Sequence, residues 1–331
     1  MKKILVTGGC GFIGSAFVRL TVQRGFKIVV VDCLDYAGDF ERICQVKSRI
    51  CFYKTDICNR SKIESIFRKE KPSLVINFAA QTHVDRSIKD PLVFTNTNVV
   101  GTQVLLDTCR KINTLERFVQ ISTDEVYGDI LEGEFNETFA LNPSSPYSAS
   151  KASADLLIKA YIRTFQIPAI IIRPCNNYGP WQYPEKFIPR AILYLMLNRK
   201  VQVYAQGKNI REWLFVDDCA EGILEIALKA KIGEVYNLGS GFEAQNIEVV
   251  RKILSLMDKD QSDIEFVRDR PGHDFRYKLN TDKVRREIGW QAKVSFEDGL
   301  KQTIIWCKEH KNWLVKKYQN IERFYQRCYG R

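Results

Sequence analysis

Short apolar runs alternate with amphipathic stretches through the first half of the chain. The runs predict strands, which are expected at Ile4–Thr7, Ile28–Asp32, Ile50–Thr55, Leu74–Ala80, Arg117–Ser122 and Ala169–Arg173. The stretches between them predict helices at Phe12–Arg24, Lys62–Lys69, Thr97–Lys111 and Ser148–Thr164. Strand and helix in alternation are typical of an α/β fold, so we expect a doubly wound parallel sheet with helices on both faces.

After Arg173 this regularity fades, because four prolines break the chain into loops at Pro174, Pro180, Pro184 and Pro189. The remaining pattern predicts helices at Phe187–Asn198, Asp218–Ala230, Asn246–Met257 and Phe296–His310, and strands at Trp213–Val216 and Glu234–Leu238. The second half is therefore expected to form a smaller, mixed α/β cap over the first. We assign residues 1–173 to the sheet domain, with 211–236 returning to it, and residues 174–210 and 237–331 to the cap.

A glycine-rich turn follows the first predicted strand. Gly8, Gly11 and Gly14 form a G-x-x-G-x-x-G pattern that opens the first helix. Without side chains, this turn can tighten and let a pyrophosphate approach the positive end of the helix. Asp32 ends the second strand 18 residues after Gly14, where its carboxylate can accept both adenosine ribose hydroxyls and would repel a 2′-phosphate. These features together predict a Rossmann-type site for NAD; the alternative is a structural glycine turn.

Two further segments end predicted strands at the edge of the sheet where ligands bind in parallel α/β folds. Asp56 and Ile57 follow the third strand, and the Asp56 carboxylate can accept a hydrogen bond from the adenine amine. Phe78–Thr82 ends the fourth strand, and its small residues would let the nicotinamide half lie against backbone. By themselves, both segments favour ordinary loop structure over function.

Tyr147 and Lys151 form a Y-x-x-x-K pattern at the start of a predicted helix. Residues four apart share a helix face, and an ammonium near a phenol lowers the pKa of the phenol. Tyr147 is therefore a candidate base that takes a proton from a sugar hydroxyl while hydride leaves to NAD. The alternative interpretation is the beginning of a surface helix.

A pair of adjacent carboxylates follows the fifth predicted strand in the segment Ser122–Gly128, which reads S-T-D-E-V-Y-G. Such a pair is costly unless one acid is protonated or each has its own task. Dehydration of a 4-keto sugar needs both: Glu125 can remove the C5 proton, and Asp124, as a neutral acid, can protonate the departing C6 hydroxyl. Thr123 can hold the C4 oxygen. The alternative is a solvated acidic turn.

The composition mainly indicates which classes of function are not expected. Lys and Arg number 50 against 39 Asp and Glu, giving a net charge of +11, but the surplus is dispersed apart from residues 311–317 and accompanies no nucleic-acid-binding motif. No apolar run reaches the roughly 18 residues of a membrane span. The ten cysteines form no C-x-x-C pair, and the three histidines are not at metal-ligand spacing from them. We expect a cytoplasmic enzyme with mostly buried free thiols, no metal, and neither nucleic-acid nor membrane partners.

The chain resembles the dTDP-glucose 4,6-dehydratases, a family of the extended short-chain dehydrogenase superfamily. The matching segments run in order from about Met1 to Trp313: Thr7–Gly14, Ala79–Ser87, Ser122–Gly128, Tyr147–Lys151, Asn176–Pro180, Pro184–Lys186 and Asp269–Asp274. The triplet Thr123-Asp124-Glu125 discriminates most, since related epimerases and decarboxylases typically lack the acid pair and GDP-mannose 4,6-dehydratases look like T-S-E there. The resemblance implies a hydro-lyase that oxidises C4, eliminates water across C5–C6 and returns the hydride to C6.

The resemblance also implies site residues and an assembly. It assigns catalysis to Thr123, Asp124, Glu125, Tyr147 and Lys151. It assigns NAD contacts to Gly8, Gly11, Phe12, Ile13, Gly14, Asp32, Cys33, Leu34, Asp35, Asp56, Ile57, Phe78, Ala79, Ala80, Gln81, Thr82, Thr97, Tyr147, Lys151 and Asn177. It assigns contacts with the nucleoside-diphospho-sugar substrate to Thr82, Thr123, Asn176, Lys186, Phe187, Gln202, Val203, Tyr204, Arg211, Asn246, Arg270 and His273. A homodimer is implied, with an interface formed by the helices predicted at Thr97–Lys111 and Ser148–Thr164; alternatively, both helices pack only on their own sheet.

Two departures from the family pattern leave alternatives open. Bacterial members usually read A-A-E-S-H where this chain has Gln81-Thr82, and they often carry proline at the position of Gln202. The first departure resembles eukaryotic relatives and UDP-glucose dehydratases, so a UDP-glucose 4,6-dehydratase is one alternative. A sugar-nucleotide epimerase or decarboxylase is another. A non-catalytic NAD sensor is a third, although the tyrosine, lysine and carboxylates are all present.

Overall fold

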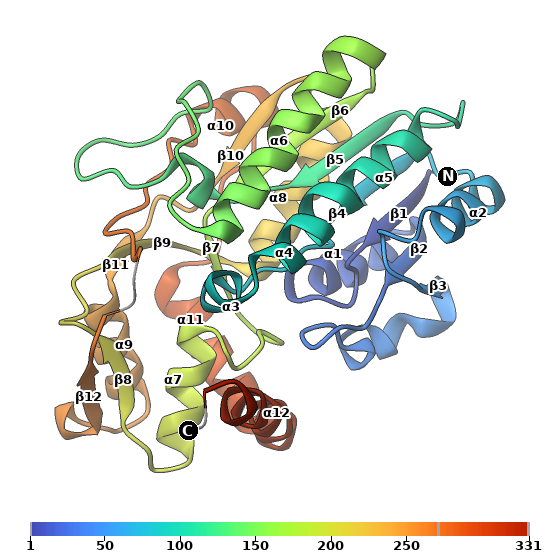
Figure 1. Cartoon of the computed structure of the whole chain (residues 1–331). Helices are drawn as coiled ribbons and strands as arrows, with labels where there is room; N and C mark the ends of the chain where they lie inside the picture. Colours follow the sequence, from blue (N-terminus) through green and yellow to red (C-terminus); the bar gives the residue numbers. More distant parts are fainter. Residues whose placement is uncertain (1, 270–271, 330–331) are drawn as a thin grey trace.

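The computed structural model describes residues 2–269 and 272–329. Within them, seven parallel strands form a central sheet in the order β10-β6-β5-β4-β1-β2-β3 (Figure 1). They are β1 (Lys3–Thr7), β2 (Lys27–Asp32), β3 (Ile50–Lys54), β4 (Leu74–Asn77), β5 (Arg117–Ile121), β6 (Ala169–Pro174) and β10 (Val235–Leu238). The strand order reverses at β1, which leaves a crevice beyond the carboxyl ends of β1 and β4.

Helices cover both faces of this sheet (Figure 1). On one face α1 (Phe12–Gln23) packs beside α8 (Val216–Lys229), and on the other lie α2 (Arg60–Glu70), α5 (Gly101–Cys109) and α6 (Pro146–Phe165). Alternate strand residues enter different cores, so that Ile4 and Val6 join the α1/α8 side whereas Leu5 joins the α2/α5/α6 side. Burial on both faces explains why these strands read as continuous apolar runs. The predicted Rossmann-type α/β fold is confirmed.

The cap contains two small sheets and four of the longer helices (Figure 1). One sheet has the order β11-β9-β7 and the other pairs β12 with β8. The elements are β7 (Asn176–Tyr178), α7 (Phe187–Met196), β8 (Val201–Tyr204), β9 (Ile210–Phe215), β11 (Glu243–Gln245), α9 (Asn246–Leu256), β12 (Ile264–Val267), α11 (Phe296–Glu309) and α12 (Lys311–Tyr329). They enclose a core of their own, in which Ile192, Val203 and Leu300 are buried.

Short elements connect these layers. They are 3₁₀ helices at Phe40–Arg49, Asp124–Tyr127 and Gln261–Asp263, a π-helical turn at Thr95–Val100, and the helices α3 (Val84–Lys89), α4 (Pro91–Phe94) and α10 (Asp282–Ile288). Helix α6 starts sharply, because Pro146 occupies its first turn and Ser145 and Ser148 form a capping box. This start fixes the position of Tyr147 in the first turn of the helix.

The predicted strands and helices are present, with differences at their ends. The strand predicted at Leu74–Ala80 is too long, because pairing stops at Asn77 and the following residues leave the sheet to line the crevice. The helix predicted from Thr97 becomes regular only at Gly101, after the π-helical turn. The strand predicted at Trp213–Val216 is β9, which pairs with β7 and β11. The sequence did not predict the strands β7, β8, β11 and β12 or the helices α3, α4 and α10, which are too short to show a clear period, nor the strongly polar α12.

Helix α12 packs against the loop that follows β2. The Trp313 indole Nε1 donates a hydrogen bond to Asp39 Oδ2 at 2.8 Å, and Lys317 Nζ lies 2.7 Å from the same oxygen. The buried Arg42 guanidinium donates through Nε to the Trp181 carbonyl at 3.0 Å. The last helix therefore holds a loop that lines the crevice between the sheet and the cap.

No helix in the part of the chain that the structure describes is long and apolar enough to cross a membrane. Within the same residues no group of three or more His, Cys, Asp or Glu side chains is placed to hold a metal ion. Nine described cysteines are free thiols, and five of these are buried.

Candidate active site

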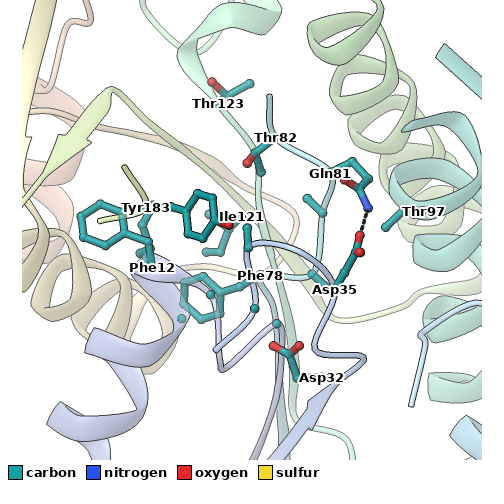
Figure 2. Close-up of a pocket in the computed structure, with 18 of the residues that line it drawn as sticks. Phe12, Asp32, Asp35, Phe78, Gln81, Thr82, Thr97, Ile121, Thr123 and Tyr183 are labelled. Carbon is teal, nitrogen blue, oxygen red and sulfur yellow. Dashed lines mark hydrogen bonds between the residues drawn. The ribbon is translucent and has the colours of Figure 1, made fainter. Parts of the chain in front are cut away.

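A cavity of about 730 Å³ lies at the carboxyl edge of the sheet, between the sheet and the cap. Every residue predicted to contact NAD lines it, and so does every predicted catalytic residue. Figure 2 shows Phe12, Asp32, Phe78 and Thr123, from four different segments, around the same space. The fold thus brings together residues from Gly8 to Asn177 that are far apart in the chain.

Two glycines of the glycine-rich turn allow close packing of backbone against backbone. Gly8 has a φ of +66°, and a Cβ there would lie 2.6 Å from the amide nitrogen of Ala79. A Cβ on Gly14 would lie 2.3 Å from the carbonyl oxygen of Gly8. Both positions therefore require glycine, and the turn presents backbone N–H groups at the start of α1, as a pyrophosphate requires.

Asp32 is held rigidly at the end of β2. Its two carboxylate oxygens accept hydrogen bonds from the backbone N–H groups of Cys10, at 2.9 Å, and Leu34, at 2.8 Å. Burial raises the pKa of this carboxyl, while the two N–H groups oppose the shift. Each oxygen retains a further lone pair, so the side chain can still accept ribose hydroxyls. This arrangement fits NAD.

Gln81 connects the two loops that border the cavity. Its Nε2 donates to Asp35 Oδ2 at 2.7 Å, which joins the loop after β4 to the loop after β2 (Figure 2). Its backbone is fixed by the buried Asn98, whose Oδ1 accepts from Gln81 N at 2.9 Å and whose Nδ2 donates to Gln81 O at 3.1 Å. Asn98 Nδ2 also donates to Ser150 Oγ on α6 at 2.8 Å. The loop and the tyrosine helix are thereby held together.

The carboxylate pair lies in the 3₁₀ turn Asp124–Tyr127, which we call the carboxylate turn. Asp124 is 2% exposed and accepts a hydrogen bond from Thr123 Oγ1 at 3.1 Å. Burial raises the pKa of Asp124 to about 8, and the negative charge of Glu125 adds to the shift. Asp124 is therefore mainly a neutral acid at pH 7, whereas Glu125, next to it, is less buried. The two carboxyls have different environments, as separate acid and base roles require.

Tyr147 and Lys151 lie on the same face of α6 and line the same cavity. The prediction that Lys151 lowers the pKa of the Tyr147 phenol is wrong in this structure. Burial raises the pKa of the Tyr147 phenol, and the charge of Glu125 raises it further, whereas a hydrogen bond with Thr123 lowers it. Lys151 does not contribute to this shift, and its Nζ donates a hydrogen bond to the Ile121 carbonyl at 2.5 Å. Burial also lowers the pKa of Lys151 to about 8, so its positive charge is weakly held.

The residues predicted for the substrate divide into two groups. Thr82, Thr123, Asn176 and Lys186 line the cavity, and Lys186 Nζ donates to the Thr82 carbonyl at 2.9 Å. The second group belongs to the cap and is not part of this lining; it consists of Phe187, Gln202, Val203, Tyr204, Arg211, Asn246 and His273. Arg270 lies outside the described residues.

Within the second group, side chains contact one another and the backbone. The Tyr204 and His273 rings meet edge to face with centroids 5.9 Å apart, and His273 Nδ1 lies 2.7 Å from Asp269 Oδ1. Arg211 lies over the Tyr277 ring at 4.4 Å and donates through Nη2 to the Asp274 carbonyl at 2.8 Å. Arg211 thus already interacts with Tyr277 and the Asp274 carbonyl, and a bound diphosphate would have to compete with these contacts.

Several buried oxygens around the cavity have no hydrogen-bond partner among the described residues: Ser122 Oγ, Asp124 Oδ2, Asn176 Oδ1, Asn177 Oδ1 and Gln182 Oε1. All five belong to residues that line the cavity. Buried polar atoms are costly when unsatisfied, so their clustering indicates a polar ligand with hydroxyl or amide donors. The nicotinamide ribose and a hexose both carry such groups.

Comparison with known proteins decides the family. A family model described as GDP-mannose 4,6 dehydratase matches residues 5–303. The dTDP-glucose 4,6-dehydratase of Neisseria meningitidis is 42% identical over 97% of this chain and 96% of its own length. A dTDP-glucose 4,6-dehydratase of Escherichia coli is also 42% identical, over 98% of this chain and 99% of its own. The chain belongs to the dTDP-glucose 4,6-dehydratase family.

Solved structures agree with this family. The dTDP-glucose 4,6-dehydratase of Streptomyces venezuelae, solved with NAD bound, is 40% identical with a TM-score of 0.93, covering 95% of this chain and 99% of that one. The UDP-glucose 4-epimerase of Thermotoga maritima is 28% identical with a TM-score of 0.88, covering 93% and 99%. Since an epimerase has nearly the same fold, the fold does not distinguish dehydration from epimerisation, whereas the acid pair of the carboxylate turn does.

The sequence did not predict part of the cavity wall. The residues that it missed include Tyr36, Arg42, Gln182, Tyr183 and Glu185. Glu185 is buried and accepts a hydrogen bond from Tyr36 Oη at 3.1 Å, while the Arg86 guanidinium lies 3.6 Å from the centre of the Tyr36 ring. Glu185 lies in a family motif, beside the predicted Lys186, and this was the available signal. Tyr36, Gln182 and Tyr183 lie in loops, and Arg42 lies in the 3₁₀ helix Phe40–Arg49, which the sequence did not predict.

Proposed function

We propose that this protein is an NAD-dependent dTDP-glucose 4,6-dehydratase. One observation carries the proposal: a buried acid whose pKa is raised to about 8, Asp124, lies beside Glu125 in the same cavity as a dinucleotide turn and the Tyr147–Lys151 pair. An epimerase needs only the oxidation machinery, whereas elimination of water needs an acid and a base as well. The relatives that are 42% identical over nearly their full length bear this activity in their names.

The cofactor proposed is NAD, which, when bound, accepts a hydride from the sugar and later returns it. Asp32 supports NAD over NADP, because a carboxylate there would repel a 2′-phosphate. The requirement for glycine at positions 8 and 14 supports a pyrophosphate in the turn. The NAD contacts proposed are the cavity-lining set named above, from Gly8 to Asn177.

The proposed cycle conserves atoms and electrons. Tyr147, which must first lose its own proton because burial raises its pKa, takes the proton of the C4 hydroxyl as C4 loses hydride, with Lys151 and Thr123 beside it. The new C4 carbonyl acidifies the C5 proton, which Glu125 removes, while Asp124 gives its proton to the C6 hydroxyl, so that water leaves. Glu125 then returns a proton to C5 as C6 regains the hydride. The product is the 4-keto-6-deoxy sugar, and no net oxidation occurs. Tyr147 then releases its proton and Asp124 takes one up, which returns both groups to their starting states.

Substrate binding is proposed for the cap. Lys186, Arg211 and Arg270 are cations that suit a diphosphate, and Tyr204 offers an aromatic face to the base. Phe187, Gln202, Val203, Asn246 and His273 of the cap, with Thr82, Thr123 and Asn176 at the carboxyl edge of the sheet, complete the proposed set. We also propose the domain division given above, with residues 174–210 and 237–331 as the nucleotide-sugar-binding domain. Within the segment 211–236, β9 still pairs with the cap strands β7 and β11, and α8 and β10 then join the sheet domain. The pairing of β10 with β6 supports the return of the chain to the sheet domain.

Assembly and location complete the proposal. We propose a homodimer formed through α5 and α6, supported by Val100 at 42% and Leu156 at 57% exposure on or next to these helices. A cytoplasmic location is proposed because NAD and nucleotide sugars are available there. Free thiols at the nine described cysteines fit a reducing compartment.

The substrate assay tests this function directly. The purified protein is incubated separately with dTDP-glucose, UDP-glucose and GDP-mannose, and the alkali-induced absorbance of 4-keto-6-deoxy products is followed. We expect the highest kcat/KM with dTDP-glucose. A preference for UDP-glucose would show that the nucleobase is uracil and not thymine, as the resemblance of Gln81-Thr82 to UDP-glucose dehydratases suggests. A product of unchanged mass would indicate an epimerase, whereas a decarboxylase would leave these three sugars, which carry no carboxylate, unchanged. Binding of NAD without turnover of any sugar would contradict the proposal.

A further inference from the structure

A single buried guanidinium contacts both halves of the catalytic machinery. Arg173 lies on β6 and has no exposed side-chain surface. Its Nε donates to Asp155 Oδ2 at 2.9 Å, and its Nη1 donates to Tyr127 Oη at 2.8 Å. Asp155 is on α6, the helix of Tyr147 and Lys151, and Tyr127 ends the carboxylate turn. The two partners of Arg173 thus belong to the two segments whose side chains must act in succession.

Each contact lies close to the residues that act. Asp155 follows Lys151 by one helical turn, on the same helix face, and its negative charge raises the pKa of Lys151 against the effect of burial. Tyr127 follows Glu125 by two residues, and its ring lies under the guanidinium with the Arg173 carbon 4.7 Å from the ring centroid. A shift of Arg173 would therefore move either the helix or the turn relative to the other.

The network extends beyond the guanidinium on the side of the turn. Tyr127 Oη donates to Asn237 Oδ1 at 2.8 Å, and Asn237, on β10, donates through Nδ2 to the Phe135 carbonyl at 2.9 Å. The Phe135 ring stacks on Tyr127 with centroids 4.9 Å apart. Tyr127 is thus fixed at its hydroxyl and over its ring face, which makes the carboxylate turn rigid.

A buried ion pair is weak evidence for stability, since well-packed apolar residues are often as stable or more so, and its better-attested use is to fix one arrangement. We propose that Arg173 is a positioning residue that sets the spacing between the Tyr147–Lys151 pair and the Asp124–Glu125 pair. The proposal rests on the proposed function, because only a reaction that uses both pairs on one bound sugar needs this spacing. Misplacement by about 1 Å can cost on the order of 100-fold in rate.

Two variants test the two sides of the guanidinium separately. Tyr127→Phe keeps the ring but removes the hydroxyl that Arg173 contacts, so the turn alone should loosen. We expect the elimination rate to fall about 10-fold or more while oxidation of C4 and KM stay unchanged, so that NADH accumulates during turnover. Asp155→Asn keeps the shape of the side chain but removes its charge, and should slow oxidation, shift its pH profile and leave no accumulated NADH.

The measurements are stopped-flow NADH absorbance for oxidation and solvent deuterium entering C5 for elimination. Tyr161→Phe is the matched control, because Tyr161 is also on α6 and its hydroxyl donates to Asp107 at 2.8 Å, away from Arg173. Equal slowing of both steps in Tyr127→Phe, or step rates like those of the control, would overturn the proposal. Failure of the unmodified protein to convert any of the three sugars would instead count against the proposed function. Arg173→Lys, if it folds, should impair both steps.

Discussion

At the scale of single residues, the two acids of the carboxylate turn have different surroundings and can therefore have different chemical roles. Asp124 is buried under Thr123 and its pKa is raised to about 8, whereas Glu125 is less buried. The same side-chain chemistry therefore supplies a proton donor and a proton acceptor at one pH. This difference is the physical basis for assigning elimination, and not only oxidation, to the site.

Amide substitutions test this division. Asp124→Asn cannot donate a proton to the C6 hydroxyl, and Glu125→Gln cannot remove the C5 proton, so each should lower product formation about 100-fold or more. C4 oxidation should persist, because Tyr147 and Lys151 are unchanged, and NADH should build up on addition of dTDP-glucose. Glu132→Gln, in an exposed loop, is the control. Full turnover by the double variant would exclude the proposed elimination.

The pH dependence follows from the same acid. Because the pKa of Asp124 is raised to about 8, the acid is protonated below that pH and ionises as pH rises through it. The elimination rate should therefore be high on the acidic side of pH 8 and fall above it. Residual elimination by Asp124→Asn should lack this basic limb. Rapid-quench product analysis across the pH range would check both, and a limb that persists in the variant would assign the pKa to another group.

At the scale of elements, the loops after β2 and β4 meet through one hydrogen bond between Gln81 and Asp35. Gln81→Glu would place two carboxylates opposite each other, which should raise the Kd for NAD by about 2- to 5-fold at low salt, the range typical of exposed charge pairs. Isothermal titration at two salt concentrations measures this, and added salt should reduce the difference. The exposed Gln45→Glu is the charge-matched control. Restored affinity in Gln81→Glu combined with Asp35→Asn would support the contact.

The sequence predicted strands and helices where the apolar run or the amphipathic pattern was long enough to be distinct. The seven central strands and their main covering helices follow from apolar runs and amphipathic stretches, and the glycine turn and Tyr147–Lys151 fell in their expected places. The engagement of Lys151 by the Ile121 carbonyl could not be predicted, because it depends on which buried acceptor lies nearest in three dimensions. Tyr36, Arg42 and Tyr183 reach the cavity through loop geometry and tertiary packing, which local patterns do not encode.

At the scale of the whole molecule, exposed apolar side chains on the helices of one face support an interface with a second copy. Leu156→Asp would place a charge on α6 at a position 57% exposed in the single chain, and should convert the proposed dimer into monomers. Size-exclusion chromatography with light scattering measures the mass. Ile305→Asp, on α11 and 56% exposed, is the matched control and should leave the mass unchanged. A monomeric unmodified protein would contradict the interface.

The contact between α12 and the loop after β2 has a consequence for synthesis on the ribosome. Asp39 is translated 274 residues before Trp313, and Lys317, the other side chain that holds Asp39, follows Trp313. The sheet and its glycine turn can form while the chain is still growing, but the wall beside the adenosine end of the crevice is completed only after α12 has left the exit tunnel. A nascent chain stalled before Trp313 should therefore hold its dinucleotide weakly, because Asp39 would still lack both of these partners.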